Sequence, residues 1–74
     1  MSPQVVAASI RINGMEEELS VSTLAALLEE KAVDTRQRGI AVAVNGAIVP
    51  RAAWPDTRLR AGDNIEIVRA RQGG

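Results

Sequence analysis

The side chains that most often carry chemistry are missing from this sequence. Its 74 residues include no Cys and no His, so the chain offers neither a thiol nucleophile nor an imidazole base. A zinc site would have to consist of carboxylates alone, a donor set that zinc rarely takes. We therefore expect no metal site, no permanently bound cofactor and no enzymatic activity, and any reactive group should belong to the backbone.

The last two residues, Gly73 and Gly74, provide such a group. Glycine loses more conformational entropy on ordering than any other residue, so this pair is a poor end for a strand. A frayed end or the remnant of a cleaved tag would account for it. A tail without Cβ atoms can also thread a narrow channel and present a terminal carboxylate. That carboxylate can attack the α-phosphate of ATP to give an acyl-adenylate, which a sulfur or nitrogen nucleophile then opens.

Length and composition predict one small globular domain. A chain of 74 residues buries about 60% of its unfolded surface, and 46% hydrophobic and 24% charged residues are ordinary for a folded protein. Zero net charge and a single aromatic residue, Trp54, argue against nucleic-acid binding. The sequence has no apolar stretch long enough to span a membrane and no basic segment typical of a signal peptide, so we expect a cytoplasmic protein.

The charges are unevenly distributed along the chain. Residues 1–34 carry two basic and six acidic side chains, a net charge of −4, whereas residues 35–74 carry seven basic and three acidic ones, a net charge of +4. An ordinary solvated surface would account for this pattern. The alternative is that the basic half docks an acidic or phosphate-holding partner.

The hydrophobic pattern predicts a hairpin, a helix and three further strands. Alternation over 9–12, the turn Asn13-Gly14 and a returning strand over 15–21 form the hairpin. A helix capped by Ser22 then carries an apolar stripe. Strands follow at 40–44, at 47–50 after the turn Asn45-Gly46, and at 64–70, with an irregular segment over 51–60.

This order predicts an α+β fold of the β-grasp (ubiquitin-like) type, with a mixed sheet of about five strands and one helix across one face. The expected organisation is a lead-in over 1–8, the domain over 9–70 and a flexible tail over 71–74. The predicted core consists of Ile10, Ile12, Leu19, Val21, Leu24, Leu27, Leu28, Ile40, Val42, Val44, Ile48, Leu59, Ile65 and Ile67.

The second half of the sequence carries a set of recognisable residues: Asn45-Gly46, Val49-Pro50-Arg51, Trp54, Thr57, Leu59, Gly62-Asp63, Ile65-Glu66-Ile67-Val68, Ala70 and Gly73-Gly74. In these residues the sequence resembles the ThiS family, the sulfur carriers of thiamine biosynthesis. The resemblance extends over residues 9–74.

The resemblance implies a mechanism and partners. A ThiF-like adenylyltransferase would transfer AMP from ATP to Gly74, and sulfur from a cysteine-desulfurase pathway would then give a C-terminal thiocarboxylate. A ThiG-like thiazole synthase would take that sulfur for the thiazole ring. Gly73 would be the thin hinge, and Arg71 and Gln72 would be the first tail residues held by a partner.

One face of the predicted sheet is a candidate docking surface. Ala41, Ala43, Val68 and Ala70 should point away from the helix, with Arg11 and Arg69 nearby. Ordinary exposed apolar surface is the alternative. Arg51 should either pair locally, with Asp56, Asp63 or a carbonyl, or point at a partner. Trp54 should cover the edge of the core rather than bind a partner.

Two other functions remain open from the sequence. A carrier of the same fold could serve molybdopterin or another thiolation pathway, and its partner would decide between them. A ubiquitin-like interaction module would bind through the sheet, and its Gly-Gly end would be incidental.

Overall fold

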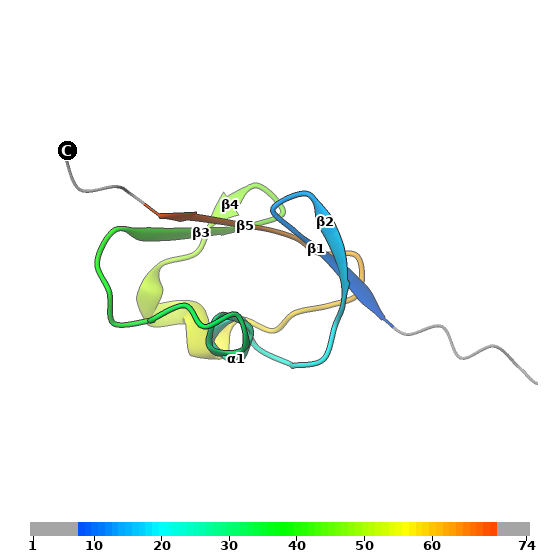
Figure 1. Ribbon diagram of the computed structural model, residues 1–74, viewed down its shortest axis with the longest axis horizontal. Helices are drawn as coiled ribbons and strands as arrows, with labels where there is room; N and C mark the ends of the chain where they lie inside the picture. The colour runs from blue at the N-terminus through cyan, green and yellow to red at the C-terminus, as the bar shows by residue number, and fades with distance from the viewer. Residues whose placement is uncertain (1–7, 70–74) are drawn as a thin grey trace, which may run out of the picture.

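In the computed structural model, which describes residues 8–69, five strands form one mixed sheet and an α-helix crosses one of its faces (Figure 1). The strand order is β2-β1-β5-β3-β4, with β1 and β5 parallel and the other neighbours antiparallel. The elements are β1 (Ser9–Ile12), β2 (Met15–Glu18), α1 (Leu24–Glu30), β3 (Ile40–Val44), β4 (Ala47–Ile48), the 3-10 helix η1 (Arg51–Asp56) and β5 (Asn64–Arg69). This architecture confirms the predicted α+β fold.

The predicted tail, residues 71–74, and Ala70 lie outside the described residues, as does nearly all of the predicted lead-in. The domain boundaries therefore stay predictions. None of the helices within residues 8–69 has both the length and the apolar character that a membrane crossing requires.

Two Asn-Gly turns close the hairpins, as predicted. Asn13 and Gly14 have φ values of 49° and 85°, and Asn45 and Gly46 have values of 52° and 86°. Positive φ at both central residues gives the turn the twist that antiparallel strands need. The turns therefore fix the register of both hairpins, with Ile12 opposite Met15 and Val44 opposite Ala47.

The start of α1 differs from the prediction. Thr23, not Ser22, is the N-cap, and its Oγ1 accepts a hydrogen bond from the Ala26 N–H at 3.2 Å. The reason is tertiary. The Ser22 carbonyl accepts from the Leu59 N–H at 3.0 Å, and Thr23 forms a bridge with Arg58. These contacts keep the chain extended for one residue longer, so the helix begins at Leu24.

Two strand boundaries and one further element also differ from the prediction. The returning strand ends at Glu18 rather than at residue 21, and the strand after Asn45-Gly46 ends at Ile48 rather than at residue 50. The segment predicted to be irregular contains η1. Its first turn closes where the Ala53 N–H donates to the Pro50 carbonyl at 2.9 Å.

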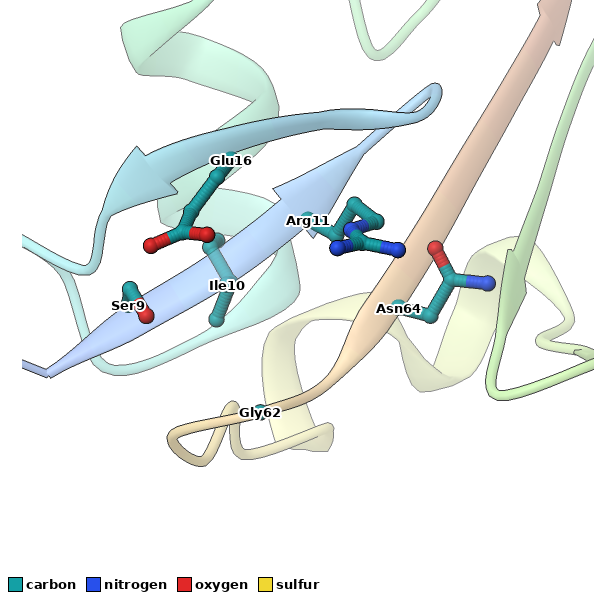
Figure 2. Close-up of a pocket in the computed structure, with 6 residues that line it drawn as sticks. All are labelled: Ser9, Ile10, Arg11, Glu16, Gly62 and Asn64. Atoms are coloured by element: carbon teal, nitrogen blue, oxygen red, sulfur yellow. The ribbon is translucent and has the colours of Figure 1, made fainter.

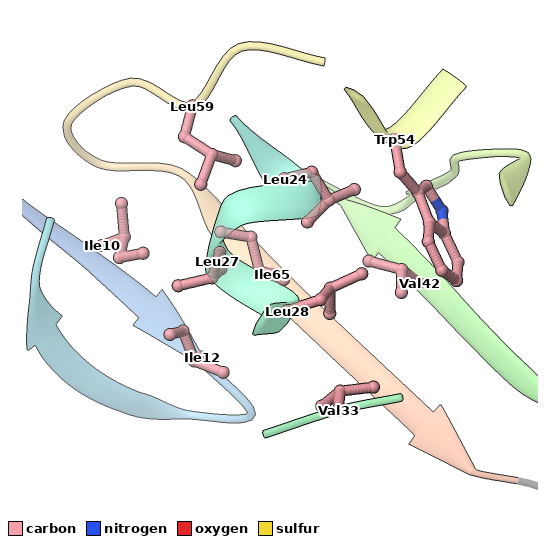
Figure 3. Packing of buried hydrophobic residues seen from close by; sticks show 10 residues of the cluster. All are labelled: Ile10, Ile12, Leu24, Leu27, Leu28, Val33, Val42, Trp54, Leu59 and Ile65. Carbon is pink, nitrogen blue, oxygen red and sulfur yellow. The ribbon is translucent and has the colours of Figure 1, made fainter. Parts of the chain in front are cut away.

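The core lies between α1 and the sheet (Figure 3). The buried hydrophobic side chains are Ile10, Ile12, Leu24, Leu27, Leu28, Val33, Val42, Trp54, Leu59 and Ile65. Of the other predicted core residues, Leu19, Val21, Ile40, Val44 and Ile67 are partly buried against this cluster.

The prediction was wrong for Ile48, which is 70% exposed. Ile48 lies opposite Ala43 on β3, and both side chains point away from the helix. Val33 and Trp54 are buried in its place. The indole of Trp54 is 2% exposed and its N–H donates to the Val49 carbonyl at 2.9 Å, which confirms its structural role.

Candidate functional site

Strand β5 positions the C-terminal segment. It lies in the middle of the sheet, between the parallel strand β1 and the antiparallel strand β3. Its last residue, Arg69, is followed by Ala70, Arg71, Gln72, Gly73 and Gly74, which lie outside the described residues. Five residues span at most about 17 Å when fully extended. The place where β5 ends therefore limits where Gly74 can act.

Asn13 holds the C-terminal half of β5 in place. Its Oδ1 accepts a hydrogen bond from the Ile67 N–H at 2.8 Å, and its Nδ2 donates to the Ile67 carbonyl at 3.3 Å. The Asn13 backbone N–H donates to the Ile65 carbonyl at 2.9 Å. Because β1 ends at Ile12, the Asn13 side chain acts as one further rung of the ladder between the two strands.

Asn45 plays the matching role at the other end of β5. Its Oδ1 accepts from the Asn64 N–H at 2.9 Å, and its Nδ2 donates to Asp63 Oδ1 at 3.0 Å. Its own N–H donates to the Asn64 carbonyl at 2.7 Å. The strand that leads to Gly74 is thus held near both ends by asparagines of the two hairpin turns. The sequence identified these asparagines as turn formers, and only their place opposite β5 shows the second role.

The outer face of the sheet, away from α1, carries most of the predicted docking residues. Ala41 lies opposite Val68, and Ala43 lies opposite both Glu66 and Ile48. Val68 is 59% exposed. The exposed apolar surface therefore includes Ile48, which was assigned to the core from the sequence, and it is interrupted by the carboxylate of Glu66.

Arg11 also lies on the outer face, one strand away from this apolar surface. It is opposite Glu16 on β2 and beside Asn64 on β5. Figure 2 shows its guanidinium directed toward Asn64, in a shallow hollow whose edge is formed by Ser9 and Gly62.

Arg69 and Arg51 are not part of that face. Arg69 lies opposite Ile40, so its side chain is on the helix side of the sheet, where it lines a hollow with Lys31 and Val33. Arg51 Nη2 donates to the Gln37 carbonyl, and its guanidinium carbon lies 4.7 Å from the centroid of the Trp54 ring. Arg51 thus forms the local carbonyl contact that was one of its two expected arrangements.

The loop before β3 contains a carboxyl group with a shifted pKa. The pKa of Asp34 is lowered from its ordinary value of 3.8. The first cause is the Arg36 backbone N–H, which donates to Asp34 Oδ1 at 3.0 Å. The Arg36 guanidinium at 3.4 Å and the positive charge of Arg51 act in the same direction.

The described residues hold no ready-made centre for chemistry. Within residues 8–69 there is no group of three Asp, Glu, His or Cys side chains that could bind a metal ion. In the same part of the chain, every buried side-chain nitrogen and oxygen has a hydrogen-bond partner. No buried side chain there is left with an unpaired polar atom to direct at a ligand.

The sequence profile of the ThiS family matches residues 4–74. The sulfur carrier protein ThiS of Thermus thermophilus is 38% identical over 63 residues, which cover 85% of this chain and 95% of that protein. This chain belongs to the ThiS family. The Escherichia coli protein of the same name is 40% identical over 52 residues, covering 70% of this chain and 76% of its own length.

One solved structure and one further protein are also similar to this chain. The crystal structure of the thiamine biosynthesis protein ThiS from Geobacter metallireducens superposes with a TM-score of 0.74 at 23% identity, covering 89% of this chain and 99% of that one. This confirms the fold. A thiazole synthase from Paramagnetospirillum magneticum is 42% identical over 64 residues, 85% of this chain, but the match spans only 19% of that protein's length.

Proposed function

We propose that this chain is the sulfur carrier for the thiazole moiety of thiamine and that the carboxylate of Gly74 is the group that carries the sulfur. The observation that supports this most strongly is the match to the ThiS family, which extends through the Gly-Gly pair to residue 74. Two of the matching relatives are named sulfur carrier proteins.

The proposed chemistry uses the backbone of the tail. A Gly74 carboxylate oxygen attacks the α-phosphate of ATP and displaces pyrophosphate, which gives an acyl-adenylate. The terminal sulfur of a persulfide then attacks the acyl carbon and displaces AMP. A second thiol cleaves the resulting acyl disulfide, so that a thiocarboxylate and a disulfide remain. Each step takes place in a partner's active site, which agrees with a chain that has no Cys and no His of its own.

Glycine suits both positions of the tail terminus. Without a Cβ atom, Gly73 and Gly74 give the smallest cross-section and the widest choice of backbone angles. Arg71 and Gln72 are the side chains that a partner would hold next to them. The Asn13 contact to Ile67 supports this arrangement, because it holds the end of β5 from which the tail continues.

The proposed partners follow from the same chemistry. A ThiF-like adenylyltransferase supplies the AMP and a cysteine-desulfurase pathway supplies the sulfur. A ThiG-like thiazole synthase is the acceptor, and the segment similar to this chain within a protein named thiazole synthase supports that pairing. In this proposal the chain is a substrate of its partners and binds neither nucleic acid nor membrane.

Alkylation followed by intact-mass measurement tests the carrier proposal. The protein ending at Gly74 is incubated with a ThiF-like enzyme, ATP and a persulfide source, and then treated with a thiol-alkylating reagent. We expect one adduct, located at Gly74. The sequence has no Cys, so a thiocarboxylate is the thiol-like group that can react. A chain ending at Gly73 is the control and should give none.

Mass without alkylation would mislead, because oxidation of Met1 or Met15 adds nearly the same mass as replacement of oxygen by sulfur. The absence of an adduct on the full chain would contradict the proposal. An adduct whose sulfur passes to a molybdopterin-forming enzyme, and not to thiazole synthase, would keep the carrier role and overturn the pathway.

A further inference from the structure

Three arginines belong to segments that meet at the end of the molecule from which the C-terminal segment continues. Arg38 stands just before β3, whose first residue pairs with Arg69 at the end of β5. Arg51 reaches the same loop, because its guanidinium donates to the Gln37 carbonyl. Figure 1 shows the loop before β3, the start of η1 and the C-terminal end of β5 on one side of the molecule.

None of these three arginines forms an ion pair within residues 8–69, although the positive charge of Arg51 acts on Asp34 in the loop before β3. The ion pairs in that part of the chain are Lys31–Glu17 and Arg36–Asp34. Arg38, Arg51 and Arg69 are exposed, and no described carboxylate lies within 4.0 Å of their guanidinium groups. The acidic residues of the hairpin lie on β2, at the edge of the sheet and two strands away from β5.

We propose that Arg38, Arg51 and Arg69 form a basic collar that binds an acidic protein surface around the entrance of the channel that receives Gly74. The inference rests on the proposed function, because it assumes a partner that holds the tail. The tail reaches at most about 17 Å beyond Arg69, so such a partner brings its surface close to the collar. At physiological salt, charges act over about 8 Å, which limits the effect to groups at this end of the molecule.

The arrangement of the arginines favours a protein surface over a single phosphate group. Arg51 lies over the Trp54 ring, whereas Arg69 lines a hollow with Lys31 and Val33 on the helix side. A phosphate site needs donors that converge on one point. Guanidinium groups spread around the end of a strand instead match a ring of carboxylates, and rim charges of this kind mainly raise the association rate.

Two charge-reversal variants test the collar, one near the C-terminal end of β5 and the other before its first residue. The test variant is Arg38→Glu/Arg69→Glu. The matched control is Arg58→Glu/Arg60→Glu, which makes the same change in net charge at two exposed arginines that precede the other end of the strand. Six residues of strand separate the two ends by about 20 Å, more than the screening length.

The measured quantity is the association rate with a ThiF-like adenylyltransferase at 50 mM and 500 mM NaCl. We expect the collar variant to associate about tenfold more slowly at low salt and to differ by less than about twofold at high salt. The control should stay within about twofold at both salt concentrations. Urea unfolding of each variant shows whether the fold is intact.

Equal losses in the two variants would overturn the collar, since net charge alone would then explain them. Unchanged association of the collar variant would overturn it as well, and so would a rise in KM for ATP at unchanged association, which would point to nucleotide phosphate. The chain without substitutions shows whether a failure concerns the collar alone or the proposed function as well. If it binds the enzyme and becomes alkylatable while the collar variant behaves identically, the collar alone fails. If it does neither, the proposed function fails and the collar fails with it.

Discussion

The two faces of the sheet are built from alternating residues of the same strands, but one face is buried and the other is exposed. On the helix side, Ile10, Val42 and Ile65 are at most 2% exposed. On the outer face, Ala41 and Val68 are exposed neighbours on β3 and β5, and Ile48 is exposed beside Ala43. One face therefore packs the core of the domain, while the outer face and the end of β5 are exposed.

The largest effect should come from the helix side. Leu28 is fully buried between α1 and the sheet, so Leu28→Ala removes packing and leaves a cavity. We expect the free energy of unfolding to fall by about 2–5 kcal/mol, measured by urea denaturation. Since small domains have only about 5–15 kcal/mol in total, the variant should be close to unfolding at 37 °C. A loss below about 1 kcal/mol would show that the core is not close-packed there.

A smaller effect should come from the Asn13 contact. Asn13→Gly keeps the positive φ of the turn but removes both side-chain hydrogen bonds to Ile67. We expect a loss of about 1 kcal/mol in unfolding free energy and faster hydrogen exchange of the Ile67 amide.

Asn13→Asp is the matched variant, because it keeps the acceptor for the Ile67 N–H and loses the donor. Slow exchange of the Ile67 amide should return in this variant. If exchange at Ile67 were equally fast in both variants, the side chain would not be what holds this part of β5.

The smallest effect on stability should come from the outer face. Ile48 is 70% exposed, so Ile48→Ser should change the free energy of unfolding by no more than about 0.5 kcal/mol in urea denaturation. If this variant lost as much stability as Leu28→Ala, the outer face would contribute as much to stability as the buried face, contrary to our expectation.

Most of the fold follows from local patterns. Each of three local patterns predicts its element correctly. These patterns are the alternation in β1, the two Asn-Gly turns and the apolar stripe of α1. The exposure of Ile48 could also have been predicted from a local pattern, the length of the turn before it. A two-residue turn places Val44 opposite Ala47, which puts the next pair, Ala43 and Ile48, on the outer face. Hydrophobicity alone had assigned Ile48 to the core.

Other features depend on distant contacts. The helix begins one residue late because Ser22 bonds with Leu59. The Asn13 side chain meets Ile67, 54 positions away in the sequence. The six residues of η1 are too few to show a helical period in the sequence. No pattern within a short window could have indicated the pairs Ser22–Leu59 and Asn13–Ile67.

The candidate site also contains residues that the sequence identifies and a residue that it misplaces. Its terminal glycines could be read directly from the sequence, and the family match supports that reading. The sequence analysis groups Arg69 with Val68, but the side chains of consecutive residues in a strand point to opposite faces, and Arg69 lies opposite Ile40 on the helix side.

We propose that Gly74 carries the function of this chain, whereas the packed face of the sheet carries its stability. This claim is tested most directly by comparing the chain that ends at Gly74 with one that ends at Gly73, in the alkylation assay and in urea denaturation. We predict equal free energies of unfolding, and a single adduct that forms only on the chain ending at Gly74. Equal alkylation of the two chains, or none of either, would contradict the account.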